Sequence, residues 1–434
     1  MHNKVLKSFL FTFDFVTLNI ALYLMLVIDN MGMPSVEFYL RHLFPMNLLF
    51  VLWMVSFFIE GLYSLREFKN SGLSVSLLKV QIVNAIVGFL FFYIFPLGIT
   101  PKTNVIVLAL LSAWFLFLNR KILFKIFSYE AFSINVSLYG NSETIDEISS
   151  QLQERPYLGF RILGRAKCIE QQIDQSADLI VIDKNENPRL KFEKEVLELL
   201  RSGQSWTDMG SFYEVITGKV SLPTLNDFWF VENCGIDKSA SYRFSKQLID
   251  SATGLLILLL TIPLFLLLFP VLLVTQGRPF FYSQVRTGLR GKDFKIYKLR
   301  TMRVDAEKDG AKWAKPKDDR ITPIGSFLRL TRIDELPQAW NILRGDMSLV
   351  GPRPERPEII SEKLEGKIPF YHARHLVRPG VTGWAQVNFR YGFSEEDTME
   401  KLQYDLYYVK NQSIWLDIKT ILKTIKIVLA GGGQ

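Results

Sequence analysis

The stretch RIDELPQAWNILRGDMSLVGPRP, residues 332–354, places two adjacent acids, Asp334 and Glu335, near the expected start of a short helix. Thr331 is the candidate N-cap, and Pro337 falls in the first turn, where proline is tolerated. The apolar residues recur at helical spacing and predict an inward face: Ile333, Leu336, Trp340 and Leu343. The helix dipole favours a carboxylate at this end, and equally a phosphate brought beside it. Taken alone, the pair is explained more simply as helix stabilisation.

The composition indicates membrane segments joined to soluble parts. The chain has 434 residues, of which 49% are hydrophobic and 22% charged, and this length suits two or three domains. The formal net charge of +8 suits anionic lipid head groups or phosphorylated substrates. A nucleic-acid partner is not expected, because the basic residues flank apolar runs and form no recognition motif. Two cysteines without a CxxC pair support neither a disulfide framework nor a zinc site.

The N-terminal part, residues 1–128, is predicted to be a four-span transmembrane helical bundle. Four apolar stretches have about the right length: residues 8–29, 43–63, 80–98 and 104–119. Asp14 and Asn19 interrupt the first stretch, and in lipid both are expected to face other helices. Most basic residues lie before the first stretch, after the second or after the fourth: Lys4, Lys7, Arg66, Lys69, Lys79, Arg120, Lys121 and Lys125. The positive-inside rule therefore puts both ends of the bundle in the cytoplasm.

Residues 129–238 are predicted to form a small cytoplasmic α/β domain, Rossmann-like but with a degenerate nucleotide fold. INVSLYG (134–140) is typical of a strand that enters a turn, and ADLIVIDKNE (177–186) of a second buried strand after a helix. The turn Gly140-Asn141-Ser142 offers one glycine, whereas a phosphate-binding turn needs several. A structural or regulatory role is favoured over nucleotide binding.

The third predicted domain, residues 239–434, begins with another uncharged run at 252–274. Its length suits a full crossing, but the basic segment that follows would then lie outside the cell. A re-entrant helix over 246–275, which enters, breaks at Pro263 and returns to the same face, avoids this conflict. The Thr261 hydroxyl is expected to satisfy a carbonyl freed at the break. An ordinary fifth span is the alternative.

The last stretch, residues 413–429, predicts an amphipathic helix in the membrane interface. Lys419, Lys423 and Lys426 fall outside its apolar stripe. Packing on the domain core gives the same pattern. The stripe consists of Ile414, Ile418, Ile421, Leu422, Ile425, Val428 and Leu429.

The C-terminal domain also supplies basic side chains that suit phosphate: Arg286, Lys298, Arg300, Arg329, Arg332, Arg353 and Arg390. Guanidinium groups match phosphate oxygens in bidentate fashion. An acid among such groups can attack phosphorus to form an acyl phosphate. It can also hold Mg²⁺, which takes one or two carboxylates together with substrate phosphates. Phosphoryl transfer needs mainly positioning and charge neutralisation, and this inventory provides both.

Four blocks resemble, in order, the catalytic domain of the bacterial sugar transferases, the monotopic polyprenyl-phosphate phosphoglycosyl transferases. They are RPFFYSQVRTGLRGKDFKIYKLRTM (278–302), IDELPQAWNILRGDMSLVGPRP (333–354), VRPGVTGWAQVN (377–388) and KLQYDLYYVKNQSIWLD (401–417). The upstream bundle and α/β domain resemble the large members of that family. PRPERPE (352–358) and NFRYGFSEED (388–397) are most similar to the exopolysaccharide-assembly branch. The mainly α-helical domain 239–434 is thus identified as a monotopic catalytic domain.

The resemblance implies a two-step transfer. Asp334 attacks the sugar-bearing phosphate of a UDP-sugar and releases UMP, and undecaprenyl phosphate then takes the phosphosugar. Glu335 matches the Mg²⁺-binding glutamate, and Pro263 matches the break in the re-entrant helix, although Thr-Ile-Pro stands where some members have Ser-Pro. Phe389 replaces a common glycine, which puts the orientation of Arg390 in doubt. The residues expected to contact substrate or phosphate are Lys298, Arg300, Arg329, Arg353 and Arg390.

Because nucleotide sugars are cytoplasmic, the resemblance favours the re-entrant helix and a catalytic domain that faces the cytoplasm at the bacterial inner membrane. Glucose-1-phosphate is the first expectation for the transferred group, with galactose or an N-acetylated sugar next, and a homodimer is an option. One alternative function is a catalytically inactive membrane scaffold or regulator of polysaccharide assembly. Another is a transferase or transporter with five true spans.

Overall fold

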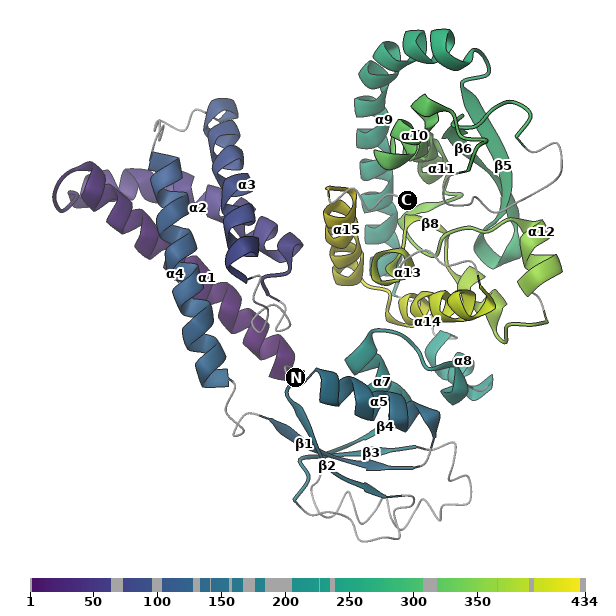
Figure 1. The fold of residues 1–434 in the computed structure, drawn as a ribbon, viewed down its shortest axis with the longest axis horizontal. Coiled ribbons are helices and arrows are strands. Elements are labelled where there is room, and N and C mark those ends of the chain that lie inside the picture. The colour runs from purple at the N-terminus through teal and green to yellow at the C-terminus, as the bar shows by residue number, and fades with distance from the viewer. Residues whose placement is uncertain are drawn as a thin grey trace. The chain divides into compact units, whose positions relative to one another are not determined.

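The chain forms two compact units, Met1–Asp208 and Met209–Gln434, in a computed structural model (Figure 1). The domain boundaries expected at 128 and 238 stay predictions. Residues 209–225, however, pack with the C-terminal unit, since Gly218 O accepts from Trp384 Nε1 at 2.7 Å. The structure describes residues 2–63, 73–95, 104–127, 133–140, 142–155, 158–166, 176–183, 205–225, 227–234, 239–306, 318–364, 366–389 and 394–429.

The first unit begins with four helices that match the four predicted apolar stretches: α1 (His2–Asp29), α2 (Val36–Glu60), α3 (Leu73–Ile94) and α4 (Asn104–Phe127). Each contains a run long and apolar enough to cross a membrane. Helix α2 begins earlier than expected because Ser35 caps it, with Ser35 Oγ accepting from Phe38 N at 3.3 Å. It ends where Gly61 adopts a left-handed φ of 90°.

Polar side chains inside these helices join them to one another. Asp14 on α1 is fully buried and forms a bidentate ion pair with Arg120 on α4, at 2.7 and 2.6 Å. The prediction that Asp14 faces another helix is confirmed. Asn19 differs, because its amide donates to Phe15 O of its own helix at 3.0 Å. Arg120 lies inside α4 and is buried, so it is not the loop charge that the sequence suggested.

A four-stranded parallel sheet follows, in the order β2-β1-β3-β4. Both strands expected from the sequence are present. The helix α5 after β1 is amphipathic and buries Ile145, Ile148 and Leu152. The doubly wound, Rossmann-like assignment stays a prediction. The elements are β1 (Ile134–Tyr139), α5 (Glu143–Glu154), β2 (Phe160–Ala166), β3 (Leu179–Ile182) and β4 (Ser205–Asp208).

A buried acid lies beside the turn that leads from β1 to α5. Asp183 follows β3 and is 2% exposed, and the Ser142 hydroxyl at the start of α5 donates to it. Gly140 follows β1 with a φ of 140°, and a Cβ there would lie 2.7 Å from Asp183 Cβ. The structural or regulatory role of this module stays a prediction. Asn141 lies outside the described residues.

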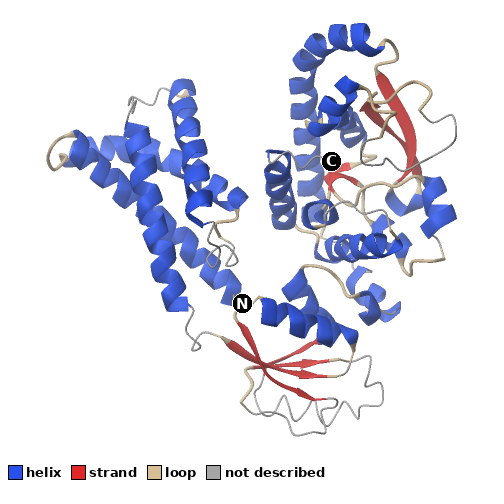
Figure 2. Ribbon diagram, in the orientation of Figure 1, coloured by secondary structure: helices blue, strands red, loops and turns tan. Residues whose placement is uncertain are grey.

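The second unit is mainly helical, with short strands (Figure 2). Its strands pair as an antiparallel hairpin β5–β6 and a short parallel pair β7–β8. The helices are α7 (Met209–Thr217), α8 (Asp227–Cys234), α9 (Ala240–Gln276), α10 (Pro323–Leu330), α11 (Ala339–Arg344), α12 (Pro357–Ile359), α13 (Trp384–Asn388), α14 (Glu395–Asn411) and α15 (Ile414–Leu429). The strands are β5 (Phe281–Thr287), β6 (Asp293–Leu299), β7 (Ser348–Val350) and β8 (Gly380–Thr382).

Helix α9 touches the rest of its unit at both ends. Near its start, Asp250 Oδ1 accepts from Leu349 N at 3.1 Å. Near its end, Leu272 is buried against Leu299 and Leu328. Figure 1 shows the helix bending before it leads into β5, although helical structure is continuous from Ala240 to Gln276.

Two prolines lie inside α9, Pro263 and Pro270. The carbonyl that Pro263 leaves without its usual donor is that of Leu259. The Thr261 hydroxyl instead donates to Ile257 O at 2.6 Å. The expectation that Thr261 compensates for Pro263 is therefore wrong, because a threonine hydroxyl reaches the carbonyl one turn before its own residue.

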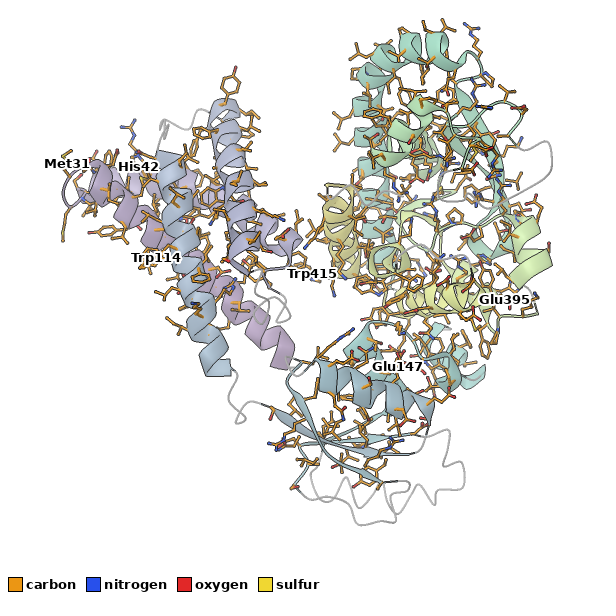
Figure 3. The ribbon with its side chains drawn as sticks, in the orientation of Figure 1. Met31, His42, Trp114, Glu147, Glu395 and Trp415 are labelled. Atoms are coloured by element: carbon orange, nitrogen blue, oxygen red, sulfur yellow. The ribbon has the colours of Figure 1, made fainter. Side chains whose placement is uncertain are left out.

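Helix α15 presents part of its predicted apolar stripe outward. Ile418 and Ile425 are about two-fifths exposed, and Trp415, labelled in Figure 3, is largely exposed. The buried side of the helix carries the polar Asp417 and Thr420 as well as Leu416, and Ile421 of the stripe packs against the core. An apolar side chain that stays outside while polar ones are buried indicates a surface that meets something other than water.

Candidate active site

The acid pair lies on a 3₁₀ helix, η6 (Ile333–Gln338), that leads directly into α11. Arg332 adopts a left-handed φ of 60° and turns the chain between α10 and η6. Thr331 is not the N-cap that the sequence suggested, because it ends α10, with its hydroxyl donating to Phe327 O at 2.9 Å. A residue with helical backbone at the end of one helix cannot cap the next.

The predicted inward face of this stretch is wrong for Trp340, whereas Ile333 packs against the buried Leu272, Leu299 and Leu328. Asp334 and Glu335 are 6% and 8% exposed, whereas Trp340 is 50% exposed. A 3₁₀ helix has three residues per turn, so its faces differ from those of the α-helix assumed from the sequence. The side that carries the acids faces β6, which contacts η6. The acid pair is therefore buried, and such charges need partners.

Three cations surround the carboxylate of Glu335. Lys298 Nζ and Arg353 Nη2 both donate to Oε1, each at 2.9 Å, and Arg332 Nη1 lies 3.5 Å from Oε2. Burial alone would raise the pKa of Glu335, but Lys298, Arg353 and Arg332 outweigh it and hold this pKa well below its usual range. Glu335 is therefore ionised at neutral pH.

The pKa of Asp334 is shifted in the opposite direction. Its Oδ1 is buried and has no hydrogen-bond partner in the part of the chain that the structure describes. Burial and the neighbouring charge of Glu335 raise its pKa, while Lys298, Arg329 and Arg332 lower it in part. A buried carboxylate oxygen without a donor is costly to keep. Such an atom suits a group that acts on a ligand.

Lys298 reaches the acid pair because β6 is fastened to α11. The side chain of Asn341, fully buried, donates from Nδ2 to Lys295 O at 2.7 Å. Its Oδ1 accepts from Tyr297 N at 3.2 Å. The amide thus imitates the pairing of a neighbouring strand and fixes β6 one residue before Lys298.

The other predicted basic residues have separate surroundings. Arg329 on α10 donates from Nε to Thr301 Oγ1 at 2.8 Å, and its charge acts on Asp334. Arg300 lies beyond β6, and its guanidinium donates to Gly277 O at 2.8 Å and to Gln276 O at the end of α9. Its role toward phosphate stays a prediction. Arg390 lies outside the described residues.

Several residues that support the site were not among the predicted site residues. Arg332 was noted as a basic side chain that suits phosphate, but it was not predicted to contact substrate. Arg374 donates to Arg353 O at 2.9 Å and pairs with Asp405 at 2.7 Å. The sequence did contain one signal for this pair. Asp405 lies between Leu402 and Leu406, which are buried on the same helix, and an acid at such a position needs a buried partner.

The acid pair also has donor atoms that suit Mg²⁺. Asp334 Oδ1 has no partner among the described residues, and Arg332 Nη1 lies 3.5 Å from Glu335 Oε2. Mg²⁺ in phosphate-transfer sites is bound by one or two carboxylates and by the substrate itself. No cluster of three or more His, Cys, Asp or Glu side chains occurs among the described residues. The residues present therefore fit a cation that arrives with a phosphorylated substrate.

Comparison with known proteins shows the class to which this fold and site belong. Residues 241–431 match the family model described as "Bacterial sugar transferase". A UDP-glucose:undecaprenyl-phosphate glucose-1-phosphate transferase from Caulobacter vibrioides is 39% identical over 186 residues, which cover 42% of this chain and 69% of that protein. The chain belongs to the bacterial sugar transferase family.

Two further relatives differ in the sugar that they are named for. A UDP-N-acetylgalactosamine-undecaprenyl-phosphate N-acetylgalactosaminephosphotransferase from Aeromonas hydrophila is 40% identical over 220 residues, 51% of each chain. A UDP-glucose:undecaprenyl-phosphate glucose-1-phosphate transferase from Xanthomonas campestris pv. campestris is 41% identical over 212 residues. That match covers 48% of this chain and 43% of the relative. The chain thus spans about half the length of these two curated relatives.

Proposed function

We propose that this protein transfers a sugar-1-phosphate from a UDP-sugar to undecaprenyl phosphate, as the first step of assembling an exopolysaccharide, capsule or O-antigen. One observation carries the proposal. Asp334 Oδ1 is buried without a described partner, beside a glutamate that two cations contact at 2.9 Å. A nucleophile next to fixed positive charge is what transfer of a phosphoryl group requires.

The reaction proceeds in two displacements at one phosphorus atom. An oxygen of Asp334 attacks the phosphorus that bears the sugar, and the bond from that phosphorus to the UMP oxygen breaks. UMP leaves with the bonding electrons, and an aspartyl-phosphosugar remains. An oxygen of undecaprenyl phosphate then attacks the same phosphorus, and the carboxylate of Asp334 is released unchanged. The product is undecaprenyl diphosphate sugar.

The basic residues are assigned by where they lie. Lys298 and Arg353, both on Glu335, are close enough to share charge with phosphate oxygens that enter beside Asp334. Arg329 reduces the cost of ionising Asp334. Bound Mg²⁺ would supply further neutralisation of the diphosphate, with Glu335 as its protein ligand. The roles of Arg300 and Arg390 in binding substrate are proposed from the resemblance alone.

We also propose that α9 is re-entrant and that the catalytic unit faces the cytoplasm. Both ends of α9 contact the same unit, through Asp250 at one end and Leu272 at the other. A straight helix of 37 residues would be about 55 Å long, and its ends would emerge on opposite faces of a bilayer. The exposed Trp415 and Ile418 of α15 suit the membrane interface.

The donor sugar is proposed as glucose, with N-acetylgalactosamine as the competing choice. Relatives from Xanthomonas campestris and Caulobacter vibrioides are named for glucose-1-phosphate. The relative from Aeromonas hydrophila is named for N-acetylgalactosamine. A homodimer stays a prediction.

The test uses the full-length protein in lipid nanodiscs with Mg²⁺, radiolabelled UDP-glucose or UDP-N-acetylgalactosamine, and no acceptor. The expected result is label bound to protein with equal release of UMP, abolished in Asp334→Asn. An Asp293→Asn variant, whose carboxylate is exposed at the start of β6, is the matched control and retains labelling. Lipid-linked product without protein-bound label would indicate direct transfer. Neither label nor product with any donor would favour a membrane scaffold.

The path of α9 is tested separately with single cysteines in a chain that has Cys168 and Cys234 replaced by alanine. Ser241→Cys places an exposed thiol in the first turn of α9, and Lys292→Cys places one after the helix. A membrane-impermeant maleimide is expected to label both in inverted vesicles and neither in intact cells. Labelling of the two positions from opposite sides would establish a fifth span.

A further inference from the structure

Arg353 belongs to a segment whose backbone is held from outside. Pro352 and Pro354 flank it and have no N–H, so the segment has few backbone donors of its own. Its carbonyl groups accept from five elements, one of which is α9, whose Lys246 Nζ donates to Val350 O at 3.2 Å. The other contacts are Tyr408 Oη to Val350 O (2.9 Å), Gly380 N to Pro352 O (2.9 Å), Arg374 Nη2 to Arg353 O (2.9 Å), Arg286 Nη1 to Pro354 O (3.0 Å) and Thr287 N to Glu355 O (3.0 Å).

Among these contacts, the one from Arg374 requires a charged side chain to be buried. It is 6% exposed on η8 (Tyr371–Leu376), and besides Arg353 O it contacts the hydroxyl of Tyr371 at 2.5 Å. Its charge is matched by Asp405 on α14, which is 2% exposed and lies 2.7 Å from Nη2. An ion pair buried so deeply is expensive to form.

The same helix holds the segment at a second point. Tyr408 is one turn after Asp405 on α14, and its hydroxyl reaches Val350 O. Asp405 therefore acts on Arg353 through Arg374, while Tyr408 acts on the strand before it. Hydrophobic side chains of the same shape would pack against this segment, but they would not bind its carbonyls.

We propose that Arg374, held by Asp405, is a positioning residue that keeps the guanidinium of Arg353 on Glu335. This inference rests on the reaction proposed above for its catalytic consequence. A guanidinium can donate to Arg353 O, Tyr371 and Asp405 together because its N–H groups point in fixed directions from one plane. A lysine ammonium at the same place retains the charge but lacks this planar fork.

The proposal makes a specific statement about combined substitutions. Residues that act through one another do not give additive effects. Arg374→Lys is expected to slow single-turnover labelling of Asp334 by about tenfold or more. Arg353→Ala is expected to slow it further, and the double variant Arg353→Ala/Arg374→Lys should label at the rate of Arg353→Ala. If the two losses multiply instead, Arg374 acts independently of Arg353 and the proposal is wrong.

Asp405→Asn provides a second variant if Arg374→Lys does not fold, and it should show the same dependence on Arg353. Lys410→Gln is the matched control. Lys410 lies on the same helix and pairs with Glu214 at 2.8 Å, at a point that has no contact with Arg353 among the described residues. The Lys410→Gln variant should label at the rate of the unaltered protein. If it does label more slowly, this factor should multiply with the factor measured for Arg353→Ala in the double variant.

Hydrogen exchange of the full-length protein gives a readout that needs no activity. The amide of Gly351 donates to Thr382 O at 2.9 Å, so it reports on the held segment. Arg374→Lys should increase exchange of a peptide covering residues 348–359, and Lys410→Gln should not. If hydrogen exchange is unchanged in Arg374→Lys, the positioning role is wrong, whether or not a donor sugar labels the protein. If exchange increases but no donor sugar labels the protein, the positioning role stands and only the proposed reaction is contradicted.

Discussion

Lys298 Nζ lies 2.9 Å from Glu335 Oε1 and thereby connects strand β6 to the 3₁₀ helix η6. The same oxygen accepts from Arg353 at 2.9 Å, so one carboxylate holds two cations that arrive from different elements. Glu335 thus gathers positive charge beside Asp334, as the proposed reaction requires. The two acids have opposite electrostatic situations although they are neighbours in the sequence. Their pKa values are shifted in opposite directions.

Replacing Lys298 with methionine should change the pH dependence of labelling. The charge of Lys298 lowers the pKa of both acids, so its loss raises both. Because attack requires ionised Asp334, the acidic limb of the rate profile should move to higher pH. The plateau rate should also fall, by about 100-fold. Lys295→Met, an exposed position on the same strand, should change neither quantity. A lower plateau with an unmoved limb would refute this electrostatic role.

Asp334→Asn should stabilise the protein at neutral pH while it abolishes labelling. The folded-state pKa of Asp334 is raised above its ordinary value of 3.8. The folded state therefore binds the proton more tightly, and stability falls as pH rises from 3.8 through the raised pKa. Removing the charge should raise the unfolding temperature at pH 7.5 by about 2–4 °C. The gain should shrink as pH falls toward 3.8.

Glu335→Gln is the informative counterpart, because the sign reverses. The pKa of Glu335 is held low, so its stabilising contribution is present above its ordinary value of 4.5 and is lost as pH falls through the folded-state pKa. The glutamine variant should therefore melt at a lower temperature at pH 7.5. Equal shifts of the same sign in both variants would show that the two acids do not differ as argued.

Local sequence predicted those parts of the site that depend on neighbouring residues. The acid pair and the basic blocks could be chosen from a motif. Lys298 on β6 and Arg353, in the segment after β7, both contact Glu335. The direction in which the acid pair points could not be predicted from the sequence. One left-handed residue, Arg332, precedes a 3₁₀ helix where an α-helix was expected. With three residues per turn instead of 3.6, Asp334 and Glu335 fall on the buried side of η6, while Ile333 still packs inward.

Contacts between segments far apart in the chain were harder to predict from the sequence. Asp14 was expected to face another helix, but its partner Arg120 looked like a loop charge because it begins the basic cluster that follows the fourth apolar stretch. Arg374 and Asp405 carry no local sign that they hold the carbonyl of Arg353. Their function depends on how η8 and α14 meet the segment, and that is a property of tertiary packing. A backbone carbonyl is the same at every residue, so no pattern marks it.

Asn341→Leu should destabilise the second unit. Leucine has a similar size but leaves Lys295 O and Tyr297 N of β6 without their partner. Two unsatisfied groups at a fully buried position should cost about 2–4 kcal/mol. Denaturant unfolding of the full chain measures the loss, and labelling should slow because β6 carries Lys298. Asn411→Leu, which removes only a local bond to Tyr407 O, should cost less than about 1 kcal/mol. Equal costs for the two variants would contradict the fastening role of Asn341.

The ion pair of Asp14 and Arg120 allows a test within the helical bundle. Both residues are buried and their bidentate contact joins α1 to α4. Asp14→Leu leaves a buried guanidinium without its counter-charge and should cost about 3–5 kcal/mol. Arg120→Met should cost a similar amount for the converse reason. The double variant should recover most of the loss, since two apolar side chains remove the burial cost of both charges. SDS titration of the full-length protein, followed by helical circular dichroism, measures the three midpoints. If the double variant loses the sum of the single losses, the two side chains are not paired in the membrane.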